Sequence, residues 1–110
     1  MRAADQIVRT LEAHGVARVY CVPGESYLAL LDALHGSSIQ VIVCRHEGGA
    51  GFMACAEAKL TGKPAVIIAS RGPGATNASI AIHMANQDGL PVILMVGQVA
   101  REERDRKSVV

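Results

Sequence analysis

The sequence predicts an α/β domain, a parallel sheet with helices on both faces. Short apolar runs rich in β-branched residues alternate with segments of helical periodicity, and glycine or proline separates each run from the next helix. Strands that alternate with helices imply right-handed crossovers, and strands with few polar residues imply a sheet buried on both sides. With 110 residues, the length corresponds to about one domain.

The first two predicted elements are a helix and a strand. Apolar residues recur at the spacing of one helical face, at Ala4, Ile7, Val8 and Leu11. Gly15 follows, a residue type suited to the left-handed conformation that ends many helices. The run 17–22 then predicts a strand, which the pair Pro23-Gly24 ends.

The same order of strand, turn and helix is repeated along the rest of the chain. Ser26 precedes a helical pattern of leucines that ends at Gly36. Further strands are predicted at residues 39–44, 65–70 and 91–97. Further helices are predicted at 52–60 and 78–87, after the glycine-rich segment 46–51 and the turn 71–77.

The carboxyl ends of the predicted strands hold the residues that are unusual for a core. These are Pro23-Gly24, 45–47, 71–74 and 97–98. Ligands of parallel α/β sheets bind beyond the carboxyl ends of the strands. We therefore expect one edge of the sheet to carry any binding site.

The segment 71–77, RGPGATN, has two interpretations. Its glycines would let backbone N–H groups approach an anion at a helix N-terminus. It lacks the Lys-Ser/Thr pair of a phosphate-binding loop, and Asn77 stands where a dinucleotide fingerprint has its third glycine. Taken alone, the segment favours a tight turn in which Thr76 or Asn77 caps the next helix, with ligand contact as the alternative.

Glu47 is a carboxylate between a predicted strand and a predicted helix. By position alone it fits an ordinary glutamate of a first helical turn, where the macrodipole favours negative charge. The small residues 48–51 favour a second interpretation, because they leave room for a flat ligand or a second subunit. A carboxylate beside so much small apolar surface is suited to proton relay.

Composition and charge exclude several classes of function. The net charge of +1 gives no electrostatic basis for nucleic-acid binding. No apolar run is long enough to span a membrane, and no basic leader with a cleavage site opens the chain. We expect a cytoplasmic protein with no metal site, with surface histidines at 14, 35 and 83, and with three reduced cysteines, Cys21, Cys44 and Cys55.

A family resemblance is carried by five segments in this order: VPGESYLALLDAL, RHEGGAGFMA, KLTGKPAV, SRGPGATNASIAIHMANQD and PVILMVGQV. Together they resemble the N-terminal pyrimidine-binding domain of thiamine-diphosphate enzymes. The likeness is greatest to the group of acetolactate synthase, pyruvate oxidase and benzoylformate decarboxylase. We expect residues 1–98 to form part of such a domain, incomplete at its C-terminal end, and 99–110 to be a charged tail or the start of the next segment.

The resemblance assigns roles to individual residues. Glu47 falls on the family's glutamate, which would hydrogen-bond N1′ of the aminopyrimidine and favour the imino tautomer that removes the C2 proton. Pro23 and Gly24 match the turn near the pyrimidine ring. Pro73 and Asn77 match positions of a loop that lines the same pocket.

The resemblance also implies a cofactor, a substrate and partners. Thiamine diphosphate would be bound with Mg²⁺, which the family holds in a C-terminal domain whose Gly-Asp-Gly and Asn motif does not occur in these 110 residues. The resemblance is also compatible with FAD as a second bound cofactor in a full-length relative. The substrate would be a 2-oxo acid undergoing decarboxylation or carboligation, and the chain would form a dimer or larger homo-oligomer. Gln98 matches a glutamine at the rim of the site.

Gly48 and Glu57 are among the positions that depart from the family pattern. Gly48 stands where acetolactate synthases commonly have glutamine, which puts that specific activity in question. Glu57 stands where relatives usually have an aromatic residue, and a buried glutamate is costly unless it is paired.

Three functions follow from these observations. We expect the parent protein to be an enzyme of this family, and the 110-residue chain alone to bind only the pyrimidine half of the cofactor and not to catalyse. A non-catalytic α/β subunit that oligomerises or binds a partner through apolar helices is the alternative. A nucleotide-binding module of flavodoxin or Rossmann type is a third function, which Asn77 weakens. An incomplete sheet has an unpaired edge, so we expect marginal stability unless the chain associates.

Overall fold

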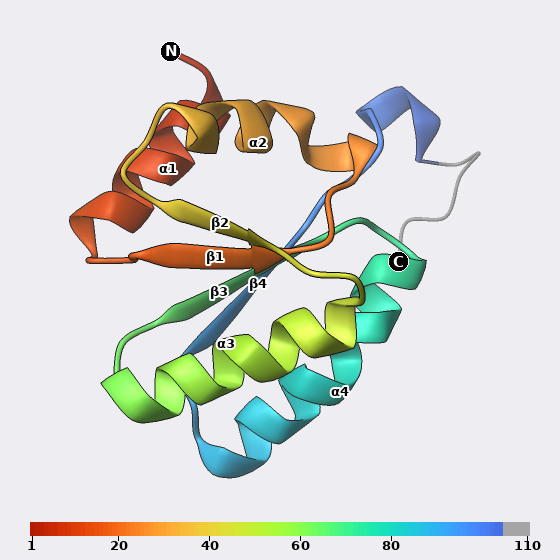
Figure 1. Ribbon diagram of the computed structural model, residues 1–110. Coiled ribbons are helices and arrows are strands. Elements are labelled where there is room, and N and C mark those ends of the chain that lie inside the picture. Colours follow the sequence, from red (N-terminus) through yellow and green to blue (C-terminus); the bar gives the residue numbers. More distant parts are fainter. Residues whose placement is uncertain (105–110) are drawn as a thin grey trace.

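Four parallel strands form one sheet at the centre of the molecule (Figure 1). The computed structural model describes residues 1–104. The strands are β1 (Arg18–Cys21), β2 (Gln40–Val43), β3 (Ala65–Ala69) and β4 (Val92–Val96), in the order β2-β1-β3-β4. All three neighbouring pairs are parallel, which confirms the predicted α/β class and places each strand within one residue of its predicted bounds.

Helices cover both faces of the sheet, as predicted (Figure 1). One face carries α1 (Ala3–Ala13) and α2 (Leu28–His35), with the short 3-10 helix η1 (Glu25–Tyr27) leading into α2. The other carries α3 (Glu47–Thr61) and α4 (Pro73–Asp88), and a second 3-10 helix, η2, spans Arg101–Glu103. No described helix is both long and apolar enough to cross a membrane.

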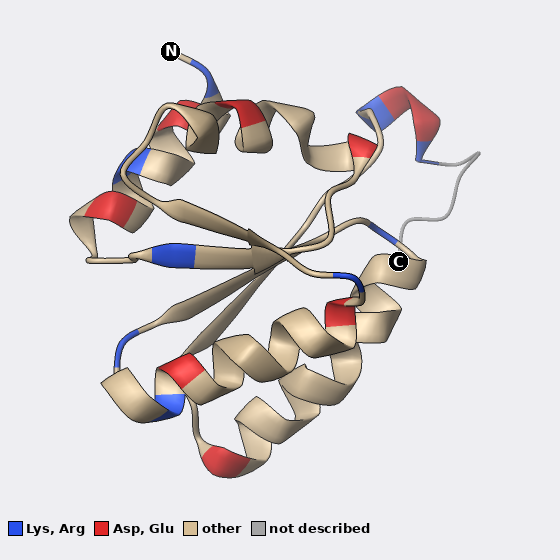
Figure 2. Cartoon of the chain, in the orientation of Figure 1, with Lys and Arg blue, Asp and Glu red and all other residues tan. Residues whose placement is uncertain are grey.

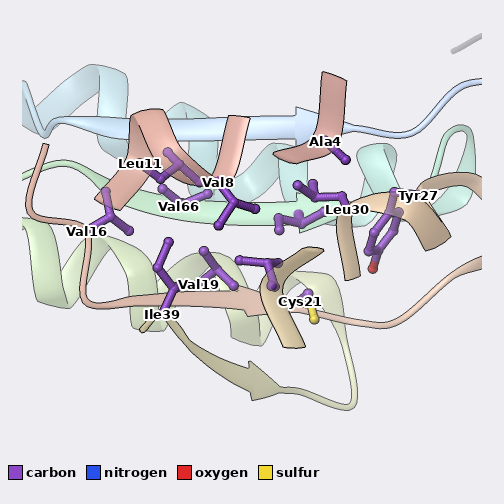
Figure 3. Packing of buried hydrophobic residues seen from close by; sticks show 12 residues of the cluster. Ala4, Val8, Leu11, Val16, Val19, Cys21, Tyr27, Leu30, Ile39 and Val66 are labelled. Atoms are coloured by element: carbon purple, nitrogen blue, oxygen red, sulfur yellow. The ribbon is translucent and has the colours of Figure 1, made fainter. Parts of the chain in front are cut away.

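The core is aliphatic and is divided between the two faces by the alternation of strand side chains. All five residues of β3 are buried. Val66 and Ile68 pack with the residues of α1 and α2, among the side chains drawn in Figure 3. Ile67 points to the other face and packs with alanines of α3. A central strand buried on both sides is the arrangement that its uninterrupted apolar run predicts.

The helix α3 begins earlier than the glycine pattern predicts. The helix was predicted to begin at residue 52, after the glycine-rich segment 46–51, but Glu47 is the first residue of α3 and the glycines lie inside the helix. The His46 ring caps the helix, because its Nδ1 accepts the Gly48 N–H at 2.9 Å. A Cβ on Gly51 would overlap the Cβ of Ala81, so close packing against α4 outweighs the low helix propensity of glycine.

The start of α4 also differs from the prediction. Neither Thr76 nor Asn77 caps it, because the helix already begins at Pro73 and Gly72 precedes it with a φ of 67°. Proline is well suited to a first helical turn, since its missing N–H would have no partner there. Ser26 likewise does not cap α2, because residues 25–27 form η1 instead.

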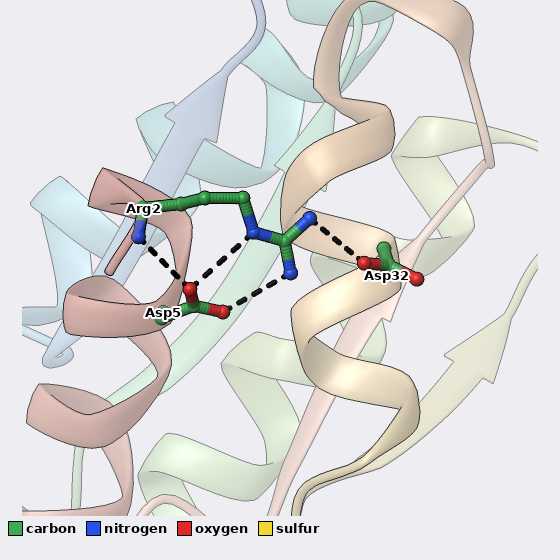
Figure 4. A network of polar contacts seen from close by, with 3 residues as sticks. All are labelled: Arg2, Asp5 and Asp32. Atoms are coloured by element: carbon green, nitrogen blue, oxygen red, sulfur yellow. Dashed lines mark hydrogen bonds and ion pairs between the residues drawn. The ribbon is translucent and has the colours of Figure 1, made fainter.

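A small polar network joins the two helices of the α1/α2 face (Figure 4). Arg2 bonds the Asp5 carboxylate with its Nε, its Nη2 and its backbone N–H, and its Nη1 lies 2.8 Å from Asp32 on α2. Hydrogen bonding to Arg2 lowers the pKa of Asp5. The side chains are largely exposed, so the network orients the helix start and adds little stability.

The contact of Gly51 with Ala81 generates a stability prediction. Gly51→Ala should lower the free energy of unfolding by about 1–3 kcal/mol, because the added methyl forces α3 and α4 apart. Gly49→Ala is the matched control in the same helix turn, where an added Cβ meets nothing within 4 Å. The control should gain about 0.5–1 kcal/mol from helix propensity. Urea denaturation measures both, and equal effects would contradict the assigned contact.

Candidate functional site

The candidate site lies at the carboxyl edge of the sheet, where the strand order reverses. Strand β2 pairs with one side of β1. The chain then crosses back over β1, and β3 pairs with the other side of β1. The crossing helices α3 and α4 both begin at this edge (Figure 1). Such a switch point leaves a crevice between two turns, and ligands of this fold class bind there.

Glu47 is the central side chain of this edge. It is the first residue of α3, and its side chain is only 9 % exposed. Its Oε1 accepts a hydrogen bond from the Nδ2 of Asn77 at 3.1 Å. The structure thus brings together two residues that lie 30 positions apart in the sequence. The buried negative charge lies at the N-terminus of α3, where the helix dipole stabilises it.

The second carboxylate oxygen is left for another partner. Oε2 accepts no hydrogen bond from residues 1–104, and it lies beside Gly74 of α4. A Cβ on Gly74 would come within 3.3 Å of Oε2 and within 2.6 Å of the Oγ of Ser70. The absence of a side chain at Gly74 therefore keeps α4 close to the carboxylate. A carboxylate oxygen with no partner among residues 1–104 can accept a hydrogen bond from an N–H or O–H group of a ligand.

The Pro23-Gly24 turn borders the same group of residues. A Cβ on Gly24 would lie 3.2 Å from the Cβ of Ser70, so the turn after β1 packs against the turn after β3. A cleft of about 330 Å³ lies between these two turns, lined by Gly24, Glu25, Ser26, Ser70, Arg71, Gly72 and Pro73. Pro23 and Pro73 are exposed at this edge. Gln98, also exposed, borders a neighbouring cleft with Ser26 and Arg71.

Several residues of this edge were not singled out by sequence reasoning. Ser70 and Gly74 were part of a motif, but nothing in the sequence indicated that they would meet Gly24 and Glu47. The capping role of His46 was also missed. His46 is exposed, although it directly precedes the buried Glu47. Family resemblance pointed to Glu47, and only the fold supplies its partners.

The structure also shows where the other polar residues considered in the sequence lie. The histidines at 14, 35 and 83 are exposed, as predicted, and the three cysteines are free thiols. Residues 1–104 contain no group of three or more His, Cys, Asp or Glu side chains that could hold a metal ion. The charged tail was predicted for 99–110, of which 105–110 lie outside the described residues, and the division at residue 98 stays a prediction.

Glu57 is paired at the far end of α3. Its Oε1 bonds the guanidinium of Arg18 and accepts the Tyr20 hydroxyl at 3.2 Å. Hydrogen bonding to Glu57 raises the pKa of Arg18, and burial followed by the charge of Glu57 raises the pKa of Tyr20. The condition set by the sequence, that a buried glutamate here needs a partner, is therefore met.

Comparison with known proteins identifies the family. The model of the thiamine pyrophosphate enzyme N-terminal TPP-binding domain matches residues 1–109. The chain belongs to this family. The sheet and helices of the described residues are those of a TPP-enzyme pyrimidine-binding domain, so the fold and the family that the sequence predicted are both confirmed.

The chain matches one part of each curated relative. It is 40% identical over 107 residues to an acetolactate synthase of Bacillus subtilis, covering 97% of this chain and 19% of that protein. It is 48% identical over 97 residues to the acetolactate synthase isozyme 1 large subunit of Escherichia coli, which covers 87% of this chain and 17% of that protein. A probable 2-ketoarginine decarboxylase of Pseudomonas aeruginosa is 41% identical over 95 residues, which covers 86% of this chain and 17% of that protein. The chain therefore spans about a fifth or less of the length of these relatives.

The bond between Asn77 and Glu47 generates a prediction on pH dependence. Asn77→Asp places a second carboxylate at 3.1 Å from the first, so the pKa of the introduced carboxyl is raised by folding. A group with a raised folded pKa stabilises below its unfolded pKa and loses that stabilisation as pH rises through the folded value. Asn77→Ala is the reference, because it removes the amide without adding charge.

The aspartate variant should be less stable than the alanine variant by about 1–2 kcal/mol at neutral pH, and the gap should close towards pH 4. Urea denaturation of both variants across this range measures the gap. A gap that is independent of pH would show that residue 77 does not face the Glu47 carboxylate.

Proposed function

We propose that Glu47 activates the aminopyrimidine of thiamine diphosphate in a 2-oxo acid decarboxylase or carboligase. The observation that carries this proposal is the state of the Glu47 carboxylate. It is nearly buried, Asn77 holds it through Oε1, and Oε2 accepts no hydrogen bond from residues 1–104. Membership of the TPP-binding family supports the cofactor. When bound, thiamine diphosphate supplies the acidic carbon that adds to the carbonyl of the substrate.

The residues of this chain would bind and orient the pyrimidine half. Oε2 of Glu47 accepts a hydrogen bond from N1′ and holds a proton at that atom. Asn77 fixes the carboxylate so that Oε2 keeps one direction. Gly74 lets α4 lie close to Oε2. The Pro23-Gly24 turn would border the ring. The low exposure of Glu47 keeps water from competing for this hydrogen bond.

For the substrate we propose only its chemical class, and for the rest of the reaction only which part of the protein would take part. The two kinds of relative named above support a 2-oxo acid, and they differ in the reaction that their names describe. Mg²⁺ and the diphosphate would be held by another part of the protein, so this chain by itself would not catalyse. The departure at Gly48 places no side chain next to His46, where a Cβ would come within 3.0 Å of Nδ1. The free cysteines support a reducing compartment, and we propose the cytoplasm.

Association through α3 and α4 is part of the same proposal. The charged residues of these helices lie near the helix ends and leave the middle of each helix uncharged (Figure 2). Their outward side chains include large apolar residues: Phe52, Met53, Leu60 and Ile80 are exposed, with Leu60 at 86 % and Ile80 at 57 %. Such a surface favours contact with another chain, which also supports the alternative of a non-catalytic partner-binding subunit.

Substitution of Glu47 tests the proposed activation. In the complete protein, Glu47→Gln should slow exchange of the C2 proton of bound thiamine diphosphate by about 100-fold or more, because the amide cannot hold the proton at N1′. Glu57→Gln is the matched control, a glutamate of the same helix that is paired away from the site. NMR of the bound cofactor measures the exchange. An unchanged rate in the Glu47 variant would refute the activating role.

Charge placed on the outer helix face tests the association. Ile80→Glu should shift the chain towards the monomer, because a charge in an apolar interface must be desolvated. Leu28→Glu is the control, since Leu28 has a similar exposure of 62 % but lies on α2. Sedimentation velocity at high concentration measures the distribution of species. A wild-type chain that stays monomeric, or a Leu28 variant that dissociates equally, would contradict this interface.

A further inference from the structure

We propose that Tyr27 is a positioning residue of the site, which holds the Pro23-Gly24 turn where it borders the bound aminopyrimidine. The inference rests on the proposed function, because only a bound ring gives the turn a ligand to face. Tyr27 lies in η1, outside the motif positions to which the family resemblance gave roles.

The hydroxyl of Tyr27 ties the turn to its own start. It donates to the backbone carbonyl of Val22, the residue that directly precedes Pro23. The bond closes residues 22–27 into a loop at a point where β1 has ended at Cys21 and ladder hydrogen bonds no longer hold the chain. Proline has no N–H to donate, so the Val22 carbonyl bond is one of the few polar restraints available to this segment.

The ring of Tyr27 fixes the position of Gly24. A Cβ on Gly24 would lie 3.5 Å from Cε1 of the ring and 3.2 Å from the Cβ of Ser70. The ring and the serine thus border the same side of the glycine. Ser70 in turn lies against Gly74, which borders Oε2 of Glu47. Gly24, Ser70 and Gly74 therefore lie next to one another between the Tyr27 ring and the carboxylate.

Burial keeps Tyr27 in the form that this role needs. The side chain is 7 % exposed and packs with Cys21, Leu30 and Ile68 of the α1/α2 core, as Figure 3 shows for the first two. Burial first, then the charges of Cys21 and Glu47, raise the pKa of the phenol. The group is therefore a neutral hydrogen-bond donor throughout the physiological pH range, and the Val22 carbonyl keeps its partner.

The other tyrosine of the chain supplies a matched control. Tyr20 is 6 % exposed and its hydroxyl also donates one hydrogen bond, to Glu57. It lies inside β1 and faces α3, away from the turn. Replacing either tyrosine by phenylalanine removes one buried hydroxyl and keeps the ring, so both variants should lose similar stability. Only the Tyr27 variant should change the site.

The experiment compares Tyr27→Phe with Tyr20→Phe in the complete protein. Calorimetric titration with thiamine diphosphate and Mg²⁺ should give a Kd about fivefold higher for the Tyr27 variant and a Kd within about twofold of the wild type for the Tyr20 variant. Amide hydrogen exchange of residues 22–27 without cofactor should become faster in the Tyr27 variant only. The melting temperature of both variants shows whether they are folded and equally destabilised.

The outcomes separate this inference from the proposed function. A Tyr27 variant that binds the cofactor within twofold of the wild type overturns the positioning role, whether or not its turn exchanges faster. If Glu47→Gln slows C2 exchange while Tyr27→Phe binds normally, only the role of Tyr27 fails. If the wild type does not bind thiamine diphosphate, or Glu47→Gln leaves the exchange unchanged, the proposed function fails and this inference fails with it.

Discussion

The close approach of α3 and α4 is the constraint on which the candidate site depends. Gly51 and Ala81 meet with no room for a further methyl group. Glu47 lies four residues before Gly51, and Asn77 lies four residues before Ala81. Residues four apart share one face of a helix, so both side chains project from the faces that meet, one turn nearer the carboxyl edge of the sheet. The hydrogen bond between them is therefore a consequence of the packing contact one turn below.

This constraint also explains where the sequence was informative and where it misled. Apolar runs and helical periodicity predicted the four strands and the four α-helices of residues 1–104, because burial on both faces of the sheet leaves a strong pattern in the sequence. The starts of α3 and α4 were misplaced, because glycine normally weakens a helix by about 1 kcal/mol and favours turns. In α3 the same glycine lets two helices come into contact, and local propensity gives no sign of that gain.

The site was only partly predictable for a related reason. Glu47 and Asn77 were found through family resemblance, since a first-turn glutamate and a helix-capping asparagine have ordinary structural explanations. Their hydrogen bond could not be predicted, because it depends on the relative placement of two helices. Ser70 and Tyr27 carry no sequence signal of their own. Both residues lie next to Gly24, and the neighbours of a glycine cannot be predicted before the fold is known.

The small residues that bring the helices together have a second effect. The inner faces of α3 and α4 are mainly glycine and alanine, side chains that bury little apolar area each. Their larger apolar side chains lie on the outside, with Phe52 next to Gly51 and Ile80 next to Ala81 in sequence. A partner that covered these outer residues would stabilise the same helix pair that holds the Glu47 carboxylate. In the proposed function, association and cofactor activation would therefore be coupled through the contact of Gly51 with Ala81.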